Sequence, residues 1–429
     1  MAVDVVVLGG GYTGVWSARA ISRAGVGARV TLVSAAPDHS FHGWTAEVVT
    51  GHVRPEHAQV PLSRLLPGVE IVRGEAVRVD PERRTVAVAT DAGIHTLRYD
   101  QLVVGVGSRD AVERVPGLRE HAWSLKDPEG LAALRAHLEQ IVPLAAQTTD
   151  FVARARLLTV VVAGAGLTGV EAATALSQRL REAVAASPQL AGWKPRVVLV
   201  HSGARPLPAL RPRFDRIAEY AMGEARAAGV EVLDRTRLAE VTPDGADLDE
   251  AGFIRSATVV TTIGQTPVAL PGLEAFARDA AGRVRTNRRL AVGPRIWAGG
   301  DVAAVPHPSG RGDCPANALW AIHHGKRIGA NVVRAVTGRC PRRFRFPGLG
   351  QGASLGIGRG AAELYGVQLT GWPAWLARWF FFHWFMPSRR VALATAREWI
   401  GWPAREARVM SPELVPAFAA APCSGAPRA

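Results

Sequence analysis

The chain has 429 residues, 48% of them hydrophobic, and this length predicts two or three domains with substantial cores. Its formal net charge of +14 favours anionic partners, but the sequence contains no long basic run and no recognisable nucleic-acid-binding module, so we expect no nucleic-acid partner. The three cysteines form no Cys-x-x-Cys pair, which argues against a disulfide framework and a redox dithiol, and no metal site is predicted.

The N-terminal segment predicts neither a leader nor a membrane span. Its apolar run contains Asp4 and lacks a basic start, so it does not have the pattern of a signal peptide. No stretch of about 18 uncharged apolar residues occurs anywhere in the chain, which argues against a spanning helix. We therefore expect a cytoplasmic protein.

The first predicted element is a buried strand, residues 5–8, that breaks directly into Gly-x-Gly-x-x-Gly and then into a helix over residues 15–23. In such a turn the first glycine makes the bend, the second lets the backbone approach a pyrophosphate, and the third allows close helix-strand packing. The partly positive N-terminus of the helix then faces the phosphates. The predicted dinucleotide contacts are Gly9, Gly11, Tyr12, Thr13 and Gly14.

A second strand is predicted over residues 29–33, and the residue after it should bind the adenosine ribose. That residue is Ser34 and not the usual Asp or Glu. A serine makes one hydrogen bond and lacks the bidentate carboxylate, so we expect ribose binding to be weaker or shifted. Asp38 is a possible substitute, although it also fits a solvated loop position.

The next segments predict short strands over residues 69–72, 77–79 and 85–89, followed by a buried strand in residues 99–108 that ends at a glycine pair. We expect this last strand to close the sheet beneath a nucleotide, with Gly107 in contact with it. An amphipathic helix over residues 129–141 and an alanine-rich loop come next.

A second glycine turn follows the apolar residues 159–163 and begins 155 residues after the first, at Gly164 compared with Gly9. Strand, Gly-x-Gly-x-x-Gly and helix recur in the same order, so the sequence predicts two bound dinucleotides. The predicted contacts in this turn are Gly164, Gly166, Leu167, Thr168 and Gly169.

The strand predicted over residues 196–200 ends at His201, where a carboxylate would select NAD. Its replacement by His201, with Arg205 nearby, removes repulsion against a 2'-phosphate and favours NADPH. A partly exposed histidine at a strand end is the alternative interpretation.

Residues 257–263 predict another apolar strand, and residues 295–303 combine a strand, a glycine pair and Asp301. From residue 3 to about residue 331, the order of these motifs resembles that of the two-dinucleotide flavoproteins. The resemblance implies that Gly300 and Asp301 approach the ribityl chain and phosphate of FAD.

Within that superfamily the chain most resembles the type II NADH dehydrogenases. The stretches that carry the resemblance are residues 124–127, 164–173, 325–331 and 354–362. The resemblance implies FAD and NAD(P)H as cofactors, hydride transfer between them, and two-electron reduction of a quinone or another small lipophilic acceptor. It also places Glu171 beside the nicotinamide, where the carboxyl group would position the ring or relay a proton; a structural cap of its helix is the alternative.

One departure from the family concerns the acceptor. The family carries Ala-Gln-x-Ala-x-Gln-Gln on a helix beside the flavin, whereas residues 318–324 have none of the glutamines and end in His323 and His324. These histidines can hydrogen-bond a carbonyl oxygen and deliver a proton, or they can simply lie on a helix surface. Two further hypotheses therefore stay open: a soluble FAD-dependent reductase of specialised metabolism, acting on an aromatic or quinonoid molecule, and a non-catalytic nucleotide sensor with a decayed flavin site.

The C-terminal region is rich in aromatic residues. Trp372, Trp375, Trp379, Phe382 and Met386 have spacings that place them on one side of a helix, and basic residues 389–390 follow. Fifteen residues reach only about 22 Å, too short for a bilayer of about 30 Å, and tryptophan prefers the membrane interface. We expect this helix to lie in the surface of the inner face of the cell membrane; a homodimer interface or a core helix is the alternative.

The predicted organisation is an α/β fold with two Rossmann-like dinucleotide-binding domains and a C-terminal amphipathic, membrane-associating module. The expected segments are FAD-binding residues 1–115, NAD(P)H-binding residues 116–255, a second FAD-binding segment 256–335, the C-terminal module 336–410 and a flexible tail 411–429.

Overall fold

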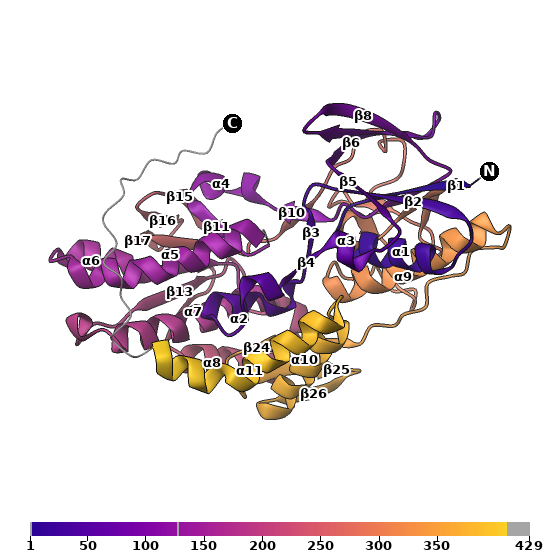
Figure 1. Cartoon of the computed structure of the whole chain (residues 1–429). Helices are drawn as coiled ribbons and strands as arrows, with labels where there is room; N and C mark the ends of the chain where they lie inside the picture. Colours follow the sequence, from indigo (N-terminus) through magenta and orange to yellow (C-terminus); the bar gives the residue numbers. More distant parts are fainter. Residues whose placement is uncertain (1, 127, 410–429) are drawn as a thin grey trace.

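The computed structural model describes residues 2–126 and 128–409, without the side chains of residues 400–409. Two parallel sheets lie side by side, and a small antiparallel sheet with two helices packs along their lower side (Figure 1). The tail predicted from residue 411 lies outside the described residues.

The first sheet is built from two distant parts of the chain. Its six strands have the order β21-β22-β9-β1-β2-β5. Their bounds are Val3–Leu8 (β1), Ala28–Ser34 (β2), Glu70–Arg73 (β5), Gln101–Val104 (β9), Ala291–Gly293 (β21) and Ile296–Ala298 (β22). Strand β1 pairs in parallel with β2 and β9, and its last four residues are buried, as expected for a central strand with both faces covered.

The second sheet has five strands in the order β11-β18-β12-β13-β14. Their bounds are Ala122–Ser124 (β11), Thr159–Ala163 (β12), Arg196–Val200 (β13), Val230–Leu233 (β14) and Thr258–Thr261 (β18). Strand β18 pairs in parallel with β12. The NAD(P)H-binding segment was predicted to end at residue 255, but the second sheet extends to Thr261, because the fully buried strand β18 pairs in parallel with β12 on one side and β11 on the other.

Smaller two- and three-stranded sheets accompany the two large sheets. Strands β6, β7 and β8 (Glu75–Asp80, Thr85–Thr90, Gly93–Arg98) form one antiparallel sheet, and β15, β16 and β17 (Leu238–Thr242, Gly245–Leu248, Gly252–Arg255) form another. Strands β3 and β4 (Asp38–Ser40, Gln59–Pro61) and strands β20 and β23 (Val284–Arg285, Ala303–Ala304) form two-stranded pairs. Where the chain crosses between the parallel sheets, β10 (Ser108–Asp110) pairs with β19 (Gln265–Pro267).

Helices α1 (Tyr12–Arg23) and α9 (Ala318–Val336) pack closely against each other beside the first sheet. Glycines on α9 permit this approach: a Cβ on Gly325 would lie 2.6 Å from Thr13 O, and one on Gly329 would lie 2.6 Å from the Cβ of Ala20. Helix α9 begins at the cap residue Asn317, whose side chain accepts a hydrogen bond from the Trp320 backbone N–H at 3.2 Å.

The remaining helices of the nucleotide sheets are α2 (Thr45–Thr50), α3 (Leu62–Leu65), α4 (Leu118–His121), α5 (Pro128–Gln147), α6 (Phe151–Leu157), α7 (Leu167–Ala185) and α8 (Asp215–Ala227). The alanine-rich loop predicted after residue 141 is wrong, because α5 continues to Gln147 and α6 follows. The side chain of Asp150 accepts a hydrogen bond from the Val152 N–H at 2.8 Å and starts α6.

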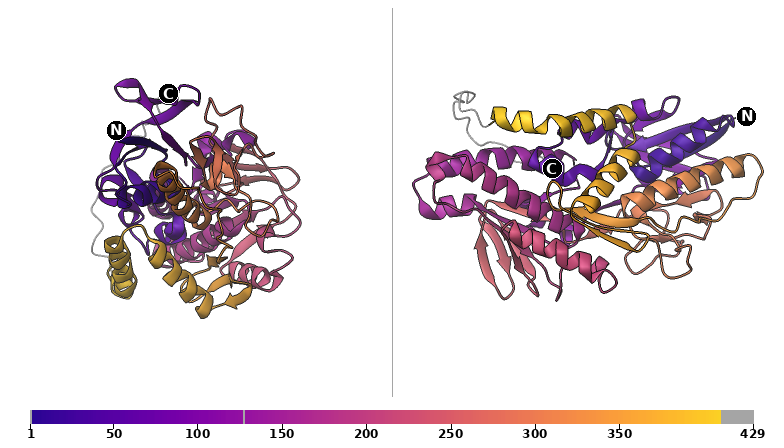
Figure 2. Two further views of the ribbon diagram at one scale, coloured as in Figure 1. Left: turned by 90° about the vertical axis from the view of Figure 1, so that its right-hand side faces the viewer. Right: turned by 90° about the horizontal axis from the view of Figure 1, so that it is seen from below.

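The C-terminal module consists of β24, β25 and β26 (Gly350–Ser354, Gly360–Leu364, Val367–Thr370) and helices α10 (Trp372–Phe385) and α11 (Arg389–Val409). Seen from below, α9, α10 and α11 lie on the near side of the molecule (Figure 2). No helix in the described part of the chain combines the length and the apolar character that a membrane span needs.

The outward face of α10 differs from the predicted one. Trp375 and Met386 are buried, and the ring of Phe382 packs edge-on against Phe41 and Trp44, so most of the predicted stripe faces the protein. The exposed apolar side chains are Trp372, Leu376, Phe380 and Trp384, spaced by four residues. Two apolar faces therefore exist on this helix, and sequence spacing alone did not distinguish them.

Candidate functional site

The two glycine turns have the same local geometry. Gly9 and Gly164 have φ angles of +101° and +107°, in the region that favours glycine. A Cβ on Gly14 would lie 1.8 Å from Gly9 O, and a Cβ on Gly169 would lie 1.8 Å from Gly164 O. Only glycine at these positions lets each helix pack against its strand.

The middle glycines are open on the side where a ligand would approach. A Cβ on Gly11 or on Gly166 would meet no described atom within 4 Å. Both residues cap their helices in an extended conformation, and neither offers a side-chain cap to the first N–H groups of α1 or α7. Free N–H groups and the helix dipole suit a pyrophosphate, so both turns fit the dinucleotides predicted for them.

A single cavity of about 740 Å³ joins the two sheets, a size within the usual range of ligand pockets of about 300–1,000 Å³. From the first sheet and its neighbours it is lined by residues 9–13, 33–36, 74–76, 105–108, 300–301 and 316–318. From the second sheet it is lined by Thr168, Glu171, Ala172, Thr261 and Thr262. No cysteine is among the lining residues.

A polar cluster lies where the cavity meets the crossing strands. Asp301 Oδ2 lies 2.8 Å from Ser108 Oγ and 3.7 Å from Lys126 Nζ, and Lys126 Nζ also donates to Gln265 Oε1 at 3.0 Å. Burial lowers the pKa of Lys126, and the adjacent Asp301 opposes that shift. The four side chains tie the turn predicted to hold FAD to both connections between the sheets.

Ser34 lines the cavity beside the first glycine turn, at the end of β2, where the sequence places the adenosine ribose. Ser34 is buried and its hydroxyl donates to the carbonyl oxygen of Ala36 at 2.7 Å. Asp38 also lines the cavity. The serine is thus engaged with its own loop, and Asp38 and Glu75 are lining carboxylates that could bond ribose hydroxyls.

The carboxyl group of Glu171, near the start of α7, lies in a buried ionic cluster. Arg378 Nη2 lies 3.0 Å from Glu171 Oε1, while Arg378 Nη1 donates to Glu47 Oε1 at 2.7 Å. The Ser354 backbone N–H donates to Glu171 Oε1 at 2.6 Å. Burial raises the pKa of Glu171 to about 7, although Arg378 opposes the shift. Glu171 can therefore gain or lose a proton near neutral pH.

The two histidines of α9 do not line the cavity. His324 is 2% exposed and its Nδ1 accepts a hydrogen bond from the Gly300 N–H at 3.1 Å. Burial lowers its pKa to about 3, so the ring is neutral and supports the Gly300 turn from behind. His323 stacks on Phe346 with 3.7 Å between ring centroids, and burial lowers its pKa to about 4. Neither ring lines the cavity, so this arrangement gives no support to the predicted proton delivery by these residues.

His201 and Arg205 lie together at the end of β13 and outside the cavity lining. A ring nitrogen of His201 lies 2.9 Å from the carbonyl oxygen of Arg205. The Arg205 guanidinium contacts Asp215 Oδ2 at 3.4 Å and Glu219 Oε1 at 2.8 Å. Its charge is thus shared with two carboxylates, which weakens the argument for a 2'-phosphate.

Sequence reasoning missed three charged residues of the cavity region: Arg378, Lys126 and Glu47. The signal for Arg378 was present, because a lone arginine interrupts an otherwise aromatic helix face. Its partners were not predictable, since Glu47 and Glu171 come from helices far away in the sequence.

These features define the class of the protein: two Rossmann-like sheets with paired glycine turns that face one cavity, the arrangement of a two-dinucleotide oxidoreductase. The predicted α/β fold is confirmed. The chain belongs to the pyridine nucleotide-disulphide oxidoreductase family, whose model matches residues 3–333.

Individual relatives show which members of the family the chain is similar to. An NADH dehydrogenase-like protein of Mycobacterium tuberculosis is 31% identical over 361 residues, covering 80% of this chain and 83% of the relative. The type II NADH:quinone oxidoreductase Ndh of M. tuberculosis is 26% identical over 88% of this chain and 83% of its own length. The demethylphylloquinone reductase NdbB of Synechocystis is 25% identical over 93% of this chain and 96% of its own. The resemblance to type II NADH dehydrogenases is confirmed.

The fold has a close counterpart among solved structures. The structure of NDH2 from Plasmodium falciparum in complex with NADH superimposes with a TM-score of 0.85, covering 94% of this chain and 98% of that chain at 14% identity. The match includes the C-terminal module as well as the two nucleotide sheets, since it covers nearly the whole chain.

Proposed function

We propose that the protein is an FAD-dependent NAD(P)H dehydrogenase that passes two electrons to a quinone-like acceptor. The observation that carries this proposal is the single cavity, which is lined by the first glycine turn and by Thr168 and Glu171 of the second turn and its helix. Relatives named as NADH:quinone oxidoreductases and as a demethylphylloquinone reductase support the reaction class.

The residues supply binding, orientation and proton control. FAD, when bound in the first glycine turn, would supply the hydride-accepting and electron-transfer chemistry. The N–H groups at the starts of α1 and α7 would hold the two pyrophosphates, and Asp301, which lines the cavity, would bond the ribityl region of FAD. Glu171, which lines the cavity, would lie beside the bound nicotinamide and hold a proton near neutral pH, while Arg378 fixes its carboxyl group.

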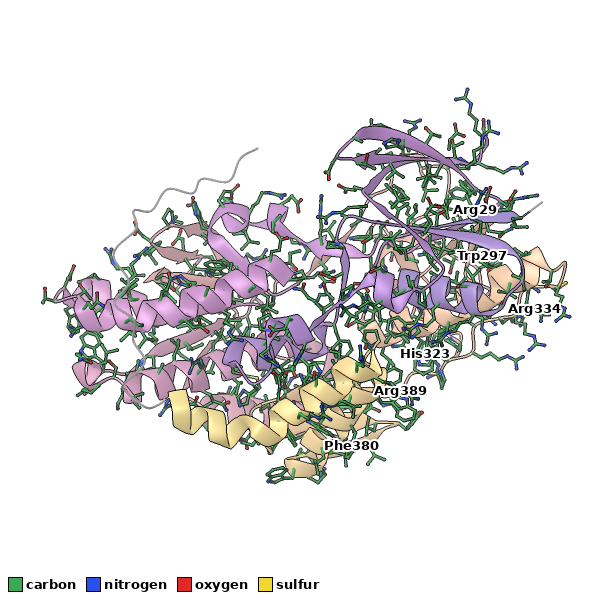
Figure 3. All side chains as sticks on the ribbon, in the orientation of Figure 1. Arg29, Trp297, His323, Arg334, Phe380 and Arg389 are labelled. Atoms are coloured by element: carbon green, nitrogen blue, oxygen red, sulfur yellow. The ribbon has the colours of Figure 1, made fainter. Side chains whose placement is uncertain are left out.

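The acceptor is lipophilic, and the protein lies peripherally on the inner face of the cell membrane. Support comes from the exposed apolar row on α10, where Phe380 is 63% and Trp384 is 83% exposed. Phe380 and Arg389 both lie on the lower side of the molecule (Figure 3). Aromatic side chains next to exposed arginines suit the interface of an anionic bilayer.

The test begins with the visible spectrum of the purified protein, followed by titration with NADH or NADPH under nitrogen. A flavin band that is bleached by the nucleotide and restored by a short-chain quinone is the expected result. A colourless protein would refute the proposal. A coloured protein that nucleotide does not bleach would point to the decayed nucleotide sensor, and reoxidation only by soluble aromatic acceptors to the reductase of specialised metabolism.

Two matched variants test which glycine turn binds FAD and which binds NAD(P)H. Gly11 and Gly166 both have negative φ angles and open space at their Cβ positions, so valine is compatible with either fold position. Gly11→Val should remove the flavin band, whereas Gly166→Val should keep the band but prevent its bleaching by NAD(P)H. The reverse pattern would mean that the two cradles are assigned the wrong way round.

A further inference from the structure

Four tryptophans form a continuous row from the cavity wall to the protein surface. The ring centroids of Trp44 and Trp399 are 6.0 Å apart, those of Trp399 and Trp375 are 5.5 Å apart, and those of Trp375 and Trp372 are 5.4 Å apart. Trp44 is 1% exposed, Trp375 is 9% exposed and Trp372 is 58% exposed. Each ring is therefore in near contact with the next, and exposure is greatest at the outer end.

The inner end of the row lies immediately behind the cavity wall. The chain neighbours of Trp44, Gly43 and Thr45, both line the cavity. Arg378 lines it as well, and its guanidinium lies 5.8 Å from the Trp44 ring centroid. A redox group in the cavity would thus have an indole ring close behind the wall it faces.

The indole N–H groups of this row favour a mobile charge. Tryptophan is among the most easily oxidised side chains, and an oxidised indole is far more acidic than the neutral ring, so it gives its N–H proton to an available acceptor. In the part of the chain that the structure describes, the buried Nε1 atoms of Trp44 and Trp399 have no hydrogen-bond partner. Without an acceptor the proton stays, and the positive charge remains free to pass to the next ring.

Burial gives the row a direction. A positive charge is costly in the protein interior and much less so in water. The charge is therefore more stable on the half-exposed Trp372 than on the buried Trp44. At Trp372 water can also accept the N–H proton, which leaves a neutral indole radical and keeps the oxidising equivalent at the surface.

We propose that, in the protein when it is not bound to a membrane, Trp44, Trp399, Trp375 and Trp372 form a one-electron relay between the cavity and a soluble thiol that reaches Trp372; this rests on the proposed function, because the oxidant is a flavin in the cavity. When the flavin absorbs blue light, Trp44 gives it one electron. Each outer tryptophan then gives one electron to its oxidised inner neighbour. A thiolate restores Trp372 and becomes a thiyl radical. Two such events and two solvent protons reduce one flavin and join two thiyl radicals in a disulfide.

The experiment illuminates the flavin-loaded protein with blue light under nitrogen in the presence of dithiothreitol and without NAD(P)H, with a dark sample as reference. Bleaching of the flavin band is followed, and the transient absorption of the tryptophan radical is recorded in parallel. Trp399→Phe and Trp372→Phe are compared with Trp193→Phe. Trp193 packs against Phe151, outside the row, and serves as the matched control.

We expect light-driven bleaching to slow several-fold in Trp399→Phe and Trp372→Phe and to keep its rate in Trp193→Phe, with a weaker tryptophan radical signal in the first two. Bleaching by NADH in the dark should be the same in all three. If Trp399→Phe fails to bind flavin, the surface variant Trp372→Phe decides the question. Equal light-driven rates in flavin-loaded proteins would overturn the relay alone and leave ordinary aromatic packing, whereas a colourless wild-type protein would overturn the relay and the proposed function together.

Discussion

Arg378 Nη2 lies 3.0 Å from Glu171 Oε1 and thereby joins the C-terminal helix α10 to the N-terminal part of α7, the helix that follows the second glycine turn. The same guanidinium also bonds Glu47 of α2. A helix whose outer face is exposed and apolar therefore supplies, from its inner face, a cation to the cavity between the two sheets. The C-terminal module is part of the site and not only an appendage.

Arg378 should stabilise the fold substantially. Replacing it in Arg378→Met leaves the carboxyl groups of Glu47 and Glu171 without their shared cation, and breaking such a buried pair costs about 3–5 kcal/mol. Urea unfolding of the flavin-loaded protein measures the loss. Arg83→Met is the control, because the Arg83 side chain is 84% exposed and its removal should change the unfolding free energy by no more than about 0.5 kcal/mol. Similar values for both variants would contradict the buried cluster.

Glu171 should make stability and turnover depend on pH. Burial raises its pKa from 4.5 to about 7, so between these values the folded chain keeps a proton that the unfolded chain has lost. Its contribution to the unfolding free energy is therefore largest below about pH 4.5 and falls as pH rises to about 7. Glu171→Gln should remove this dependence and flatten the pH profile of quinone reduction around pH 7. An unchanged profile would show that another group carries the proton.

His324 should support flavin binding without titrating. In His324→Phe the Gly300 N–H loses its acceptor, which costs about 1–3 kcal/mol and loosens the turn that carries Asp301. We expect weaker flavin retention on gel filtration, by roughly tenfold in affinity. His323→Phe is the matched control, since His323 stacks on Phe346 and bonds no part of this turn in the described residues. A greater loss of flavin in the control would reverse the assignment.

The nucleotide preference should depend on the carboxylates that hold Arg205. Glu219→Ala removes the contact of 2.8 Å and frees the guanidinium for a 2'-phosphate, so kcat/KM for NADPH should rise relative to that for NADH. Replacing His201 with Glu and Arg205 with Ala together should move the preference toward NADH. Steady-state kinetics with both nucleotides give the ratio. No shift in either variant would remove these residues from nucleotide selection.

The exposed row on α10 should decide membrane binding. Phe380→Ser combined with Trp384→Ser removes two of its most exposed aromatic side chains, and flotation with anionic liposomes should fall several-fold. Ile94→Ser is the control, because Ile94 is 72% exposed on β8, in another sheet. If the double variant floats normally but loses a dimer in light scattering, α10 covers a second copy of the chain and not a bilayer.

Local pattern was enough for the parts of the site that a few consecutive residues build. Both glycine turns were predicted residue by residue, because a tight bend and close helix packing impose glycine at fixed spacings. The strand β22 and the turn after it, which carries Gly300 and Asp301, were found in the same way. Helix and strand ends were less well predicted: α5 runs past its expected end, and β18 belongs to the second sheet, because sheet membership depends on pairing with distant strands.

The sequence by itself determined that two dinucleotide cradles occur in one chain, since each cradle is a continuous strand, turn and helix. Only the tertiary structure decided which distant side chains meet at them. It placed Arg378 beside Glu171 and His324 within hydrogen-bond distance of the Gly300 N–H. It also paired Arg205 with two carboxylates. It also selected which apolar face of α10 is buried. The physical reason is that turns follow from local backbone sterics, whereas ion pairs and buried faces depend on how separate elements pack.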